Sequence, residues 1–243
     1  MIAHALLVAT LFFGLLAAPP LAAQLDWRTA PRHASGVALN PVQYRDTAIV
    51  TVLAARTFGW RRHFAIHPWI LLKPEGHDTY TRHEVVGWGG NNVVRENYAL
   101  PDGLWFGAQP FVLKHYQGPQ AQALIPKIRE AIQSYPFADR YRSYPGPNSN
   151  TFIAHIGREV PELGLDLPPT AIGKDYRELS RPIGLAPSGT GVQFSLLGLL
   201  GLTVGLEEGL ELNILGLGFG VDLNEPAFRL PLLGRLGAGQ KID

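Results

Sequence analysis

The stretch 48-AIVTVLAAR-56 sets the fold class, because β-branched and other apolar side chains fill both faces of the run. A strand that is apolar on both faces is covered on both faces, so we expect residues 48–56 to lie in the middle of a sheet. The next apolar run, 64-FAIHPWILL-72, is also strand-like, and Pro68 predicts a free edge or a bulge because proline cannot donate to a ladder. Residues 79–89 follow the turn 73-KPEG-76 and complete a predicted β-hairpin.

Two helices are predicted further along the chain. From Pro119 to Ser134 apolar residues recur on one face of a helix, and Pro126 should kink this helix or mark its start. A second helix is expected from about Asn150 to Val160. Helices and strands in separate stretches predict an α+β fold, in which a mixed or antiparallel sheet bears the two helices.

The C-terminal region predicts a glycine-rich apolar hairpin. Residues 190–206 carry no charge and contain four glycines, Glu207-Glu208-Gly209 follows, and residues 210–222 are again largely apolar. Glycine disfavours a helix here, so we expect two long strands joined at Glu-Glu-Gly. The hairpin must be covered by the core, paired with another chain or placed against lipid, and the sequence leaves these alternatives open.

The composition is that of one globular domain. The chain has 243 residues, of which 46% are hydrophobic and 17% are charged, enough apolar material for a core and too little charge for a disordered chain. A net charge of +1 offers no electrostatic footprint for nucleic acid. The absence of cysteine excludes disulfides, a thiolate nucleophile and a cysteine-based metal site.

An uncharged apolar run at residues 2–18 resembles a signal peptide or a membrane anchor. We therefore expect residues 1–23 to be a leader or anchor and residues 24–243 to be a single domain on the periplasmic side of the cell envelope. A buried core helix is the alternative, since Arg28 and Arg32 give the wrong charge bias for export. The expected partner is the membrane, through this run and through the 190–222 hairpin as a second candidate contact; protein partners stay unknown.

Ser149, in the phrase 145-PGPNSNTF-152, has two interpretations. A serine before an apolar helix is typical of an N-cap, where its hydroxyl accepts a hydrogen bond from an otherwise unpaired N–H. The same position also suits a nucleophile, because the aligned N–H groups of a helix N-terminus stabilise a developing anion. In that case the backbone amides of Asn150 and Thr151 would hold the oxyanion.

His67 is the candidate general base, although a single histidine in an apolar strand is also typical of a structural residue. A third polar group would have to orient its ring, and His83 or Glu84 on the neighbouring strand could do so, with the choice dependent on strand register. We assign this role to His83. The string 83-HEVVG-87 lacks the second histidine of the zinc motif His-Glu-x-x-His, so neither a metal nor a cofactor is expected.

Several phrases of the sequence resemble the bacterial family called domain of unknown function 3750, and the resemblance runs from about Trp27 to Gly234. It implies an envelope-associated protein with an N-terminal membrane segment, and it implies no reaction. The phrases are 52-VLAARTFGW-60, 64-FAIHPWILLKPEG-76, 79-TYTRHEVVGWG-89, 145-PGPNSNTF-152, 171-AIGKDY-176 and 195-SLLGLLGLTVGLEEGLELNILGLGFG-220.

Two shorter phrases, 67-HPWI-70 and 148-NSNTF-152, resemble motifs of the permuted papain-like proteins, the group that includes lecithin retinol acyltransferase. There a histidine opens a strand, and a nucleophilic cysteine begins a helix. Ser149 stands where that cysteine would be, and serine needs stronger activation than a thiol. The resemblance implies either a hydrolase with a changed nucleophile or an inactive scaffold.

Two functions follow from these observations. In the first, the protein is an envelope hydrolase or acyltransferase: Ser149 attacks an amide or ester carbonyl of a peptidoglycan peptide or lipid, His67 moves the proton and His83 orients His67. In the second, the protein is a non-catalytic envelope module, and its apolar C-terminal hairpin contacts lipid or a partner.

Overall fold

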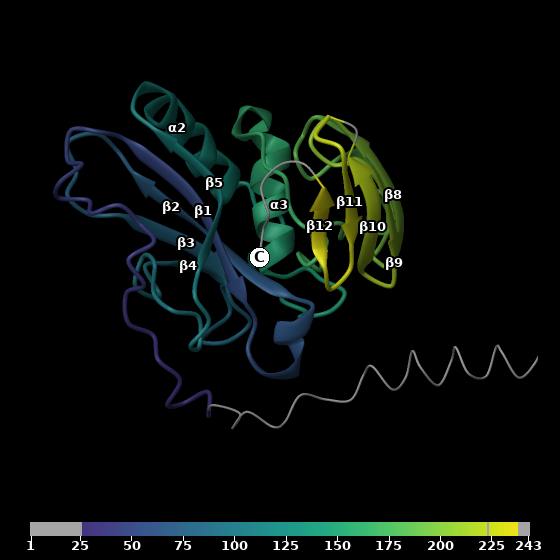
Figure 1. Ribbon diagram of the computed structural model, residues 1–243, viewed down its shortest axis with the longest axis horizontal. Coiled ribbons are helices and arrows are strands. Elements are labelled where there is room, and N and C mark those ends of the chain that lie inside the picture. The colour runs from purple at the N-terminus through teal and green to yellow at the C-terminus, as the bar shows by residue number, and fades with distance from the viewer. Residues whose placement is uncertain (1–25, 223, 238–243) are drawn as a thin grey trace, which may run out of the picture. The chain divides into compact units, whose positions relative to one another are not determined.

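The computed structural model describes residues 26–222 and 224–237, and its compact unit begins at Pro31. The expected leader, residues 1–23, lies outside the described residues. Within the compact unit the described residues form two α-helices and two antiparallel sheets, which confirms the predicted α+β class (Figure 1).

The first sheet has the strand order β4-β3-β2-β1-β5. Strand β1 lies between β2 and β5 and is almost wholly buried, as its apolar sequence predicts. Strand β3 pairs with β2 only at Ile70, Leu71 and Leu72, so Pro68 lies beyond this pairing at a free edge. The strands are β1 (Ile49–Arg56), β2 (Ile66–Lys73), β3 (Thr81–Val85), β4 (Val94–Glu96) and β5 (Phe111–Gln117).

Alternation along the strands divides this sheet into two faces. We call one the helix face, because Ile66, Ile70 and Leu72 pack there with helical residues. We call the other the loop face, because Trp69 and Leu71 pack there with Trp105 and other residues of the irregular segments. The face that the His67 side chain occupies determines which residues can act together with it.

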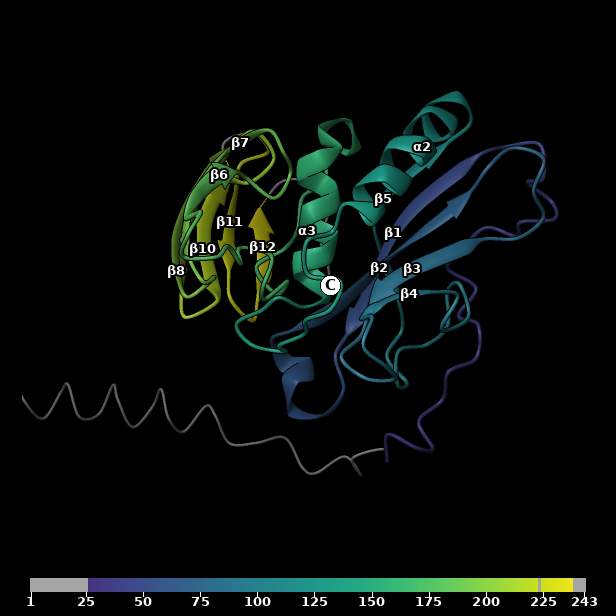
Figure 2. The same ribbon diagram turned by 180° about the vertical axis from the view of Figure 1, so that it is seen from behind.

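Helices α2 (Pro119–Gln133) and α3 (Ser149–Glu159) cover the helix face, close to their predicted bounds. Pro126 lies inside α2, which begins at Pro119 instead. Two short 3-10 helices, η1 (Gly59–His63) and η2 (Pro161–Leu163), complete the helical structure of the described residues. Helix α3 lies between the two sheets, as Figures 1 and 2 show from opposite sides.

The second sheet is a meander of seven neighbouring strands in sequence order. The predicted connection at Glu207-Glu208-Gly209 joins β8 to β9, but each expected long strand is divided in two by a tight turn. The turns lie at Leu197-Gly198 and Leu215-Gly216, where all four residues have positive φ, as in hairpin turns of type I′. The strands are β6 (Ile183–Leu185), β7 (Gly191–Leu196), β8 (Leu200–Gly205), β9 (Gly209–Ile214), β10 (Leu217–Asp222), β11 (Ala227–Leu230) and β12 (Gly234–Gly237).

Candidate functional site

The N-terminus of α3 is capped by Asn148 and not by Ser149. The Asn148 side-chain oxygen accepts hydrogen bonds from the backbone N–H groups of Asn150 (2.9 Å) and Thr151 (3.2 Å). The Thr151 hydroxyl accepts one in return from the Asn148 N–H at 3.0 Å, which completes a capping box. Ser149 is the first residue of the helix and is buried.

Asn150 and Thr151, the predicted oxyanion donors, form hydrogen bonds that hold neighbouring segments of the chain together. Their N–H groups already donate to Asn148. The Asn150 side-chain amide donates to the carbonyls of Ile66 (3.2 Å) and Ile172 (2.8 Å), and the Thr151 hydroxyl donates to another carbonyl of the 172–173 segment. The helix N-terminus is therefore held to β2 and to the segment that precedes the second sheet.

His67 belongs to a buried charged cluster on the loop face. Its Nε2–H donates to Glu84 Oε2 at 2.8 Å, and its ring stacks on that of Trp105 with centroids 3.7 Å apart. Arg82 holds the same carboxylate through both oxygens, with Nη2–Oε2 at 2.8 Å and Nε–Oε1 at 2.7 Å. The Arg82 guanidinium in turn lies 4.1 Å from the ring centre of Trp69.

The electrostatics of this cluster favour a neutral imidazole beside an ionised pair. Burial lowers the pKa of His67 below its ordinary value of 6.5, although the hydrogen bond that its ring donates to Glu84 opposes the shift. Burial alone would raise the pKa of Glu84, but its contacts with His67 and Arg82 lower it. The carboxylate is thus compensated by Arg82 and oriented, so the cluster is satisfied without a substrate.

The structure does not bring Ser149 and His67 together. His67 alternates with Ile66 and shares the loop face with Trp69, whereas α3 packs on the helix face. Ser149 precedes Phe152 and Ile153 by three and four residues, so it lies on the side of α3 that faces that sheet surface. Among the described residues no hydrogen bond links Ser149 to His67.

Glu84, rather than the predicted His83, orients the His67 ring. Neighbouring residues of a strand point to opposite faces, so Arg82 and Glu84 share the loop face while His83 lies on the other. The His83 Nδ1 atom is 3.9 Å from Glu96 Oε2, and its buried Nε2 has no hydrogen-bond partner among the described residues. The sequence left both residues possible, and only the strand register decides between them.

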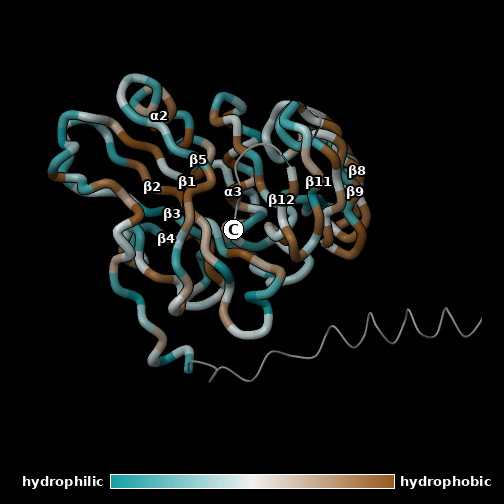
Figure 3. The backbone as a smooth tube through the Cα atoms, in the orientation of Figure 1, coloured by the Kyte–Doolittle hydropathy of each residue, from teal (hydrophilic) through white to brown (hydrophobic). Residues whose placement is uncertain are grey.

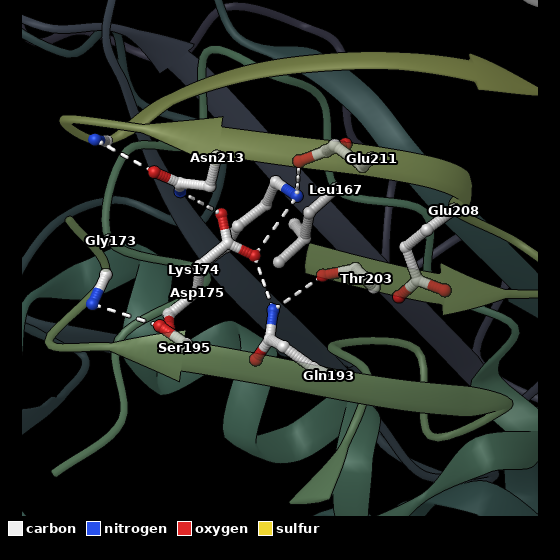
Figure 4. A network of polar contacts seen from close by, with 12 residues as sticks. Leu167, Gly173, Lys174, Asp175, Gln193, Ser195, Thr203, Glu208, Glu211 and Asn213 are labelled. Atoms are coloured by element: carbon white, nitrogen blue, oxygen red, sulfur yellow. Dashed lines mark hydrogen bonds and ion pairs between the residues drawn. The ribbon is translucent and has the colours of Figure 1, made fainter. Parts of the chain in front are cut away.

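The second sheet is polar on its inner face, which we define as the face toward α3 and residues 166–175. Asp175 accepts hydrogen bonds from the side-chain amides of Gln193 and Asn213, each at 2.6 Å, while Lys174 pairs with Glu211 (Figure 4). Asp175 and Glu211 raise the pKa of Lys174 despite its burial, so the ammonium group stays charged.

Arg229 extends this network across the inner face. It forms a bidentate pair with Asp166, at 2.7 and 2.6 Å, and its Nε lies 3.3 Å from Glu211 Oε2. Small residues make room for these charges: a Cβ atom at Gly218 would lie 2.7 Å from a Glu211 carboxylate oxygen. Inner positions of the described strands are consequently glycine, alanine or polar.

The outer face of the second sheet, which points away from α3, is apolar throughout. At the outward positions of β6 to β12 every described residue is aliphatic, phenylalanine or glycine, and Figure 3 shows hydrophobic colour along β8 and β9. The strand register aligns these side chains in rows. One row crosses all seven strands: Leu185, Val192, Val204, Leu210, Val221, Phe228 and Leu236.

A second row beside it is apolar too, and its members are 39% to 66% exposed. This row consists of Ile183, Phe194, Leu202, Leu212 and Phe219. Large aliphatic side chains in solvent and charges in the interior are the reverse of the usual arrangement of a sheet. The outer face is therefore the feature of the described structure that most needs a functional explanation.

Other kinds of site are less evident. An open hollow of about 480 Å³ is lined by residues that include neither Ser149 nor His67, namely Asn91, Asn92, Tyr135, Pro136, Ala138 and Asp139. Among the described residues no three His, Asp or Glu side chains gather in a way that could hold a metal ion. Within the same part of the chain, no helix has the length and apolar character needed to cross a membrane.

The family model described as "Protein of unknown function (DUF3750)" matches residues 47–176. This span contains the first sheet, both helices and the Lys174-Asp175 pair, and it stops before the second sheet. No curated protein and no solved structure matches the chain. Since the matched span covers more than half of the sequence, the chain belongs to the DUF3750 family.

Proposed function

We propose that the protein is a non-catalytic module of the cell envelope that rests on a lipid surface through the outer face of its second sheet. The observation that carries this proposal is the inverted sheet, with charges buried on one face and aliphatic rows exposed on the other. Residues 2–18, whose uncharged apolar sequence suits an anchor or a signal peptide, support a location at the envelope.

The size of the outer face favours a functional contact. The strands of this sheet have three to six residues each, and at about 3.3 Å per residue and about 4.8 Å per strand their outer face covers roughly 550 Å². The largest apolar patch of a typical soluble monomer covers roughly 300–600 Å² and often has a function itself. The outer face lies at the upper end of this range and carries only aliphatic, phenylalanine or glycine residues at its outward strand positions, so we infer that it is covered where the protein works.

The chemistry of the outer face favours lipid over a protein partner. Protein interfaces carry about one hydrogen bond per 100–200 Å² and are enriched in tyrosine, tryptophan, phenylalanine, methionine and arginine. Of these types the outward strand positions hold only phenylalanine, and they hold no polar side chain, while the backbone groups pair within the sheet. Hydrocarbon tails form no hydrogen bonds, so an aliphatic surface is well suited to contact with them.

The hydrolase or acyltransferase hypothesis lacks comparable support. A serine nucleophile needs a base within hydrogen-bonding reach, and the His67 ring lies on the loop face beside Glu84. His67 has a sufficient structural role, since it completes a compensated cluster under Trp105.

The proposal can be tested with single cysteines, because the natural chain contains none. Leu202→Cys and Leu212→Cys, each labelled with an environment-sensitive fluorophore, should report hydrocarbon when phospholipid vesicles are added. A label at Val42→Cys, which is more exposed (66%, against 46% for Leu202 and 42% for Leu212) and lies outside the sheet, should stay in water. This readout is local, so it separates contact by the sheet from attachment through residues 2–18.

Two results would contradict the proposal. In the first, the sheet labels stay in water on vesicle-bound protein. In the second, they become buried without vesicles in proportion to protein concentration, and sedimentation shows a dimer. That outcome would assign the outer face to a second copy of the chain.

A further inference from the structure

The two ends of the second sheet differ in chemistry. At the end we call the leucine-turn end, the connections are Leu197-Gly198, Leu215-Gly216 and residues 231–233, which contain Leu232 and Leu233. At the opposite end, which we call the acidic end, the connections contain Glu207 and Glu225. Because neighbouring strands are antiparallel, alternate connections along the chain lie at the same end of the sheet.

The exposed leucines at the leucine-turn end stand in unfavourable backbone positions. Leu215 has φ 52° and is 64% exposed, and Leu232 has φ 68° and is 54% exposed. The left-handed region strains a leucine, and glycine or asparagine is the usual choice at such turns. A solvent-exposed leucine gains no packing in return, so its apolar side chain is explained by a contact outside the molecule.

Interfacial residues surround the same end. The Tyr144 hydroxyl donates to the Leu215 carbonyl at 3.1 Å, and half of its side chain is exposed. Arg142 is exposed two residues before it. Arg181 is exposed just before β6, where Arg177 donates to its carbonyl at 3.1 Å. Tyrosine and arginine near an apolar edge are typical of the boundary between lipid tails and headgroups.

We propose, on the basis of the lipid contact inferred above, that the sheet enters an anionic phospholipid bilayer by its leucine-turn end. Leu215 and Leu232 reach the hydrocarbon, Tyr144 lies at the interface, and Arg142 and Arg181 lie against lipid phosphates. The acidic end points away from the membrane, since lipid phosphates would repel the Glu207 carboxylate, whereas Glu225 is paired with Arg235 at 3.3 Å. The partner is thus a negatively charged lipid surface, met in one orientation.

Depth measurements test this orientation. Labels at Leu215→Cys and Leu206→Cys start from equal exposure, 64% and 65%, at opposite ends of the sheet. On vesicles of phosphatidylcholine and phosphatidylglycerol, quenching by lipids with nitroxides at graded depths should place the Leu215 label deeper. The Leu202→Cys label reports in the same samples whether the sheet has docked at all.

Asparagine variants supply a matched functional test. Leu215→Asn and Leu232→Asn suit the left-handed positions, so the fold should persist. Each should lower the docked fraction at least about tenfold, because a buried leucine side chain is lost. Leu206→Asn, the control at the acidic end, should leave docking unchanged. Arg142→Gln and Arg181→Gln should each lower docking on anionic vesicles by about fivefold and leave neutral vesicles unaffected.

The outcomes separate the two proposals. If the Leu202 label enters hydrocarbon while the Leu206 label is as deep as the Leu215 label, the orientation is wrong and the lipid contact stands. Equal docking on neutral and anionic vesicles would overturn the preference for anionic lipid. If no sheet label enters hydrocarbon, both proposals fail together.

Discussion

Two adjacent residues of β9, Glu211 and Leu212, should differ in their sensitivity to substitution in the opposite order from an ordinary sheet. Here replacing the charged residue should destabilise the protein more than replacing the apolar one. Glu211 is buried on the inner face against Lys174 and Arg229. Leu212 is exposed on the outer face between Leu202 and Phe219. The pair of variants Glu211→Leu and Leu212→Glu therefore tests directly whether the sheet is inverted.

The magnitudes follow from these contacts. Glu211→Leu leaves the buried Lys174 with Asp175 at 3.5 Å as its remaining carboxylate, and removing one partner of a buried ion pair costs about 3–5 kcal/mol. Leu212→Glu loses cross-strand apolar contacts with two neighbours, worth about 0.2–1 kcal/mol each. At about 2–4 °C per kcal/mol for a chain of this size, Glu211→Leu should lower the melting temperature by roughly 6–20 °C, and Leu212→Glu by roughly 1–8 °C.

Circular dichroism during thermal and urea unfolding measures both effects, with Val42→Glu as a control for a new charge on the surface. The reasoning would be refuted if Leu212→Glu proved more destabilising than Glu211→Leu. That result would mean that the aliphatic rows are buried and that the charged face is not.

Three further predictions concern the first sheet and α3. Asn148→Ala should destabilise the protein by about 1 kcal/mol or more in urea unfolding and Ser149→Ala by less, and the reverse order would make Ser149 the cap. Because burial lowers the folded-state pKa of His67, the stability gained from its neutral ring is present above pH 6.5 and lost as the pH falls below it. Urea midpoints between pH 5 and 8 should therefore depend less steeply on pH in His67→Gln, and an unchanged slope would contradict this. A serine-reactive fluorophosphonate should leave Ser149 unlabelled, whereas labelling lost in both Ser149→Ala and His67→Ala would restore the catalytic hypothesis.

The first sheet and the helices were predictable because their apolar periodicity is strong. Residues 48–56 are apolar at nearly every position, and the structure buries this strand between two others. Helix α3 begins where the Asn-Ser-Asn-Thr phrase suggests, but several residues of that phrase could serve as the cap. Sequence cannot choose among neighbouring capping side chains, since the choice depends on which backbone conformation is extended.

The partners of His67 required long-range information. Glu84 and His83 are adjacent in sequence and point to opposite faces, so a shift of one residue in register exchanges them. Arg82 also escaped notice, although an arginine two residues from a glutamate on one strand lies on the same face. Its role becomes clear only when His67 is placed between Glu84 and Trp105.

The polarity of the two faces of the second sheet could be predicted only in part from the sequence. The strands around Phe194, Leu202 and Leu212 alternate apolar and polar side chains, which defines two faces. A polar face is ordinarily assigned to solvent. Here the inner face meets Lys174 and Asp175, more than fifteen residues away in sequence, and that contact reverses the assignment.

The buried charges explain how the second sheet can carry its apolar side chains on its outer face. A sheet usually adheres to a domain by burying its apolar face, but this one adheres through Asp175, Lys174 and Arg229. Such contacts are strong only where water is excluded and every group has a partner. The family match ends at Tyr176, directly after Lys174 and Asp175, so the matched span already contains part of the site to which the second sheet attaches. The sheet can therefore expose its aliphatic rows because buried charges hold its other face to the domain. A variant that weakens the network of Lys174, Asp175, Glu211 and Arg229 should consequently also weaken docking on lipid.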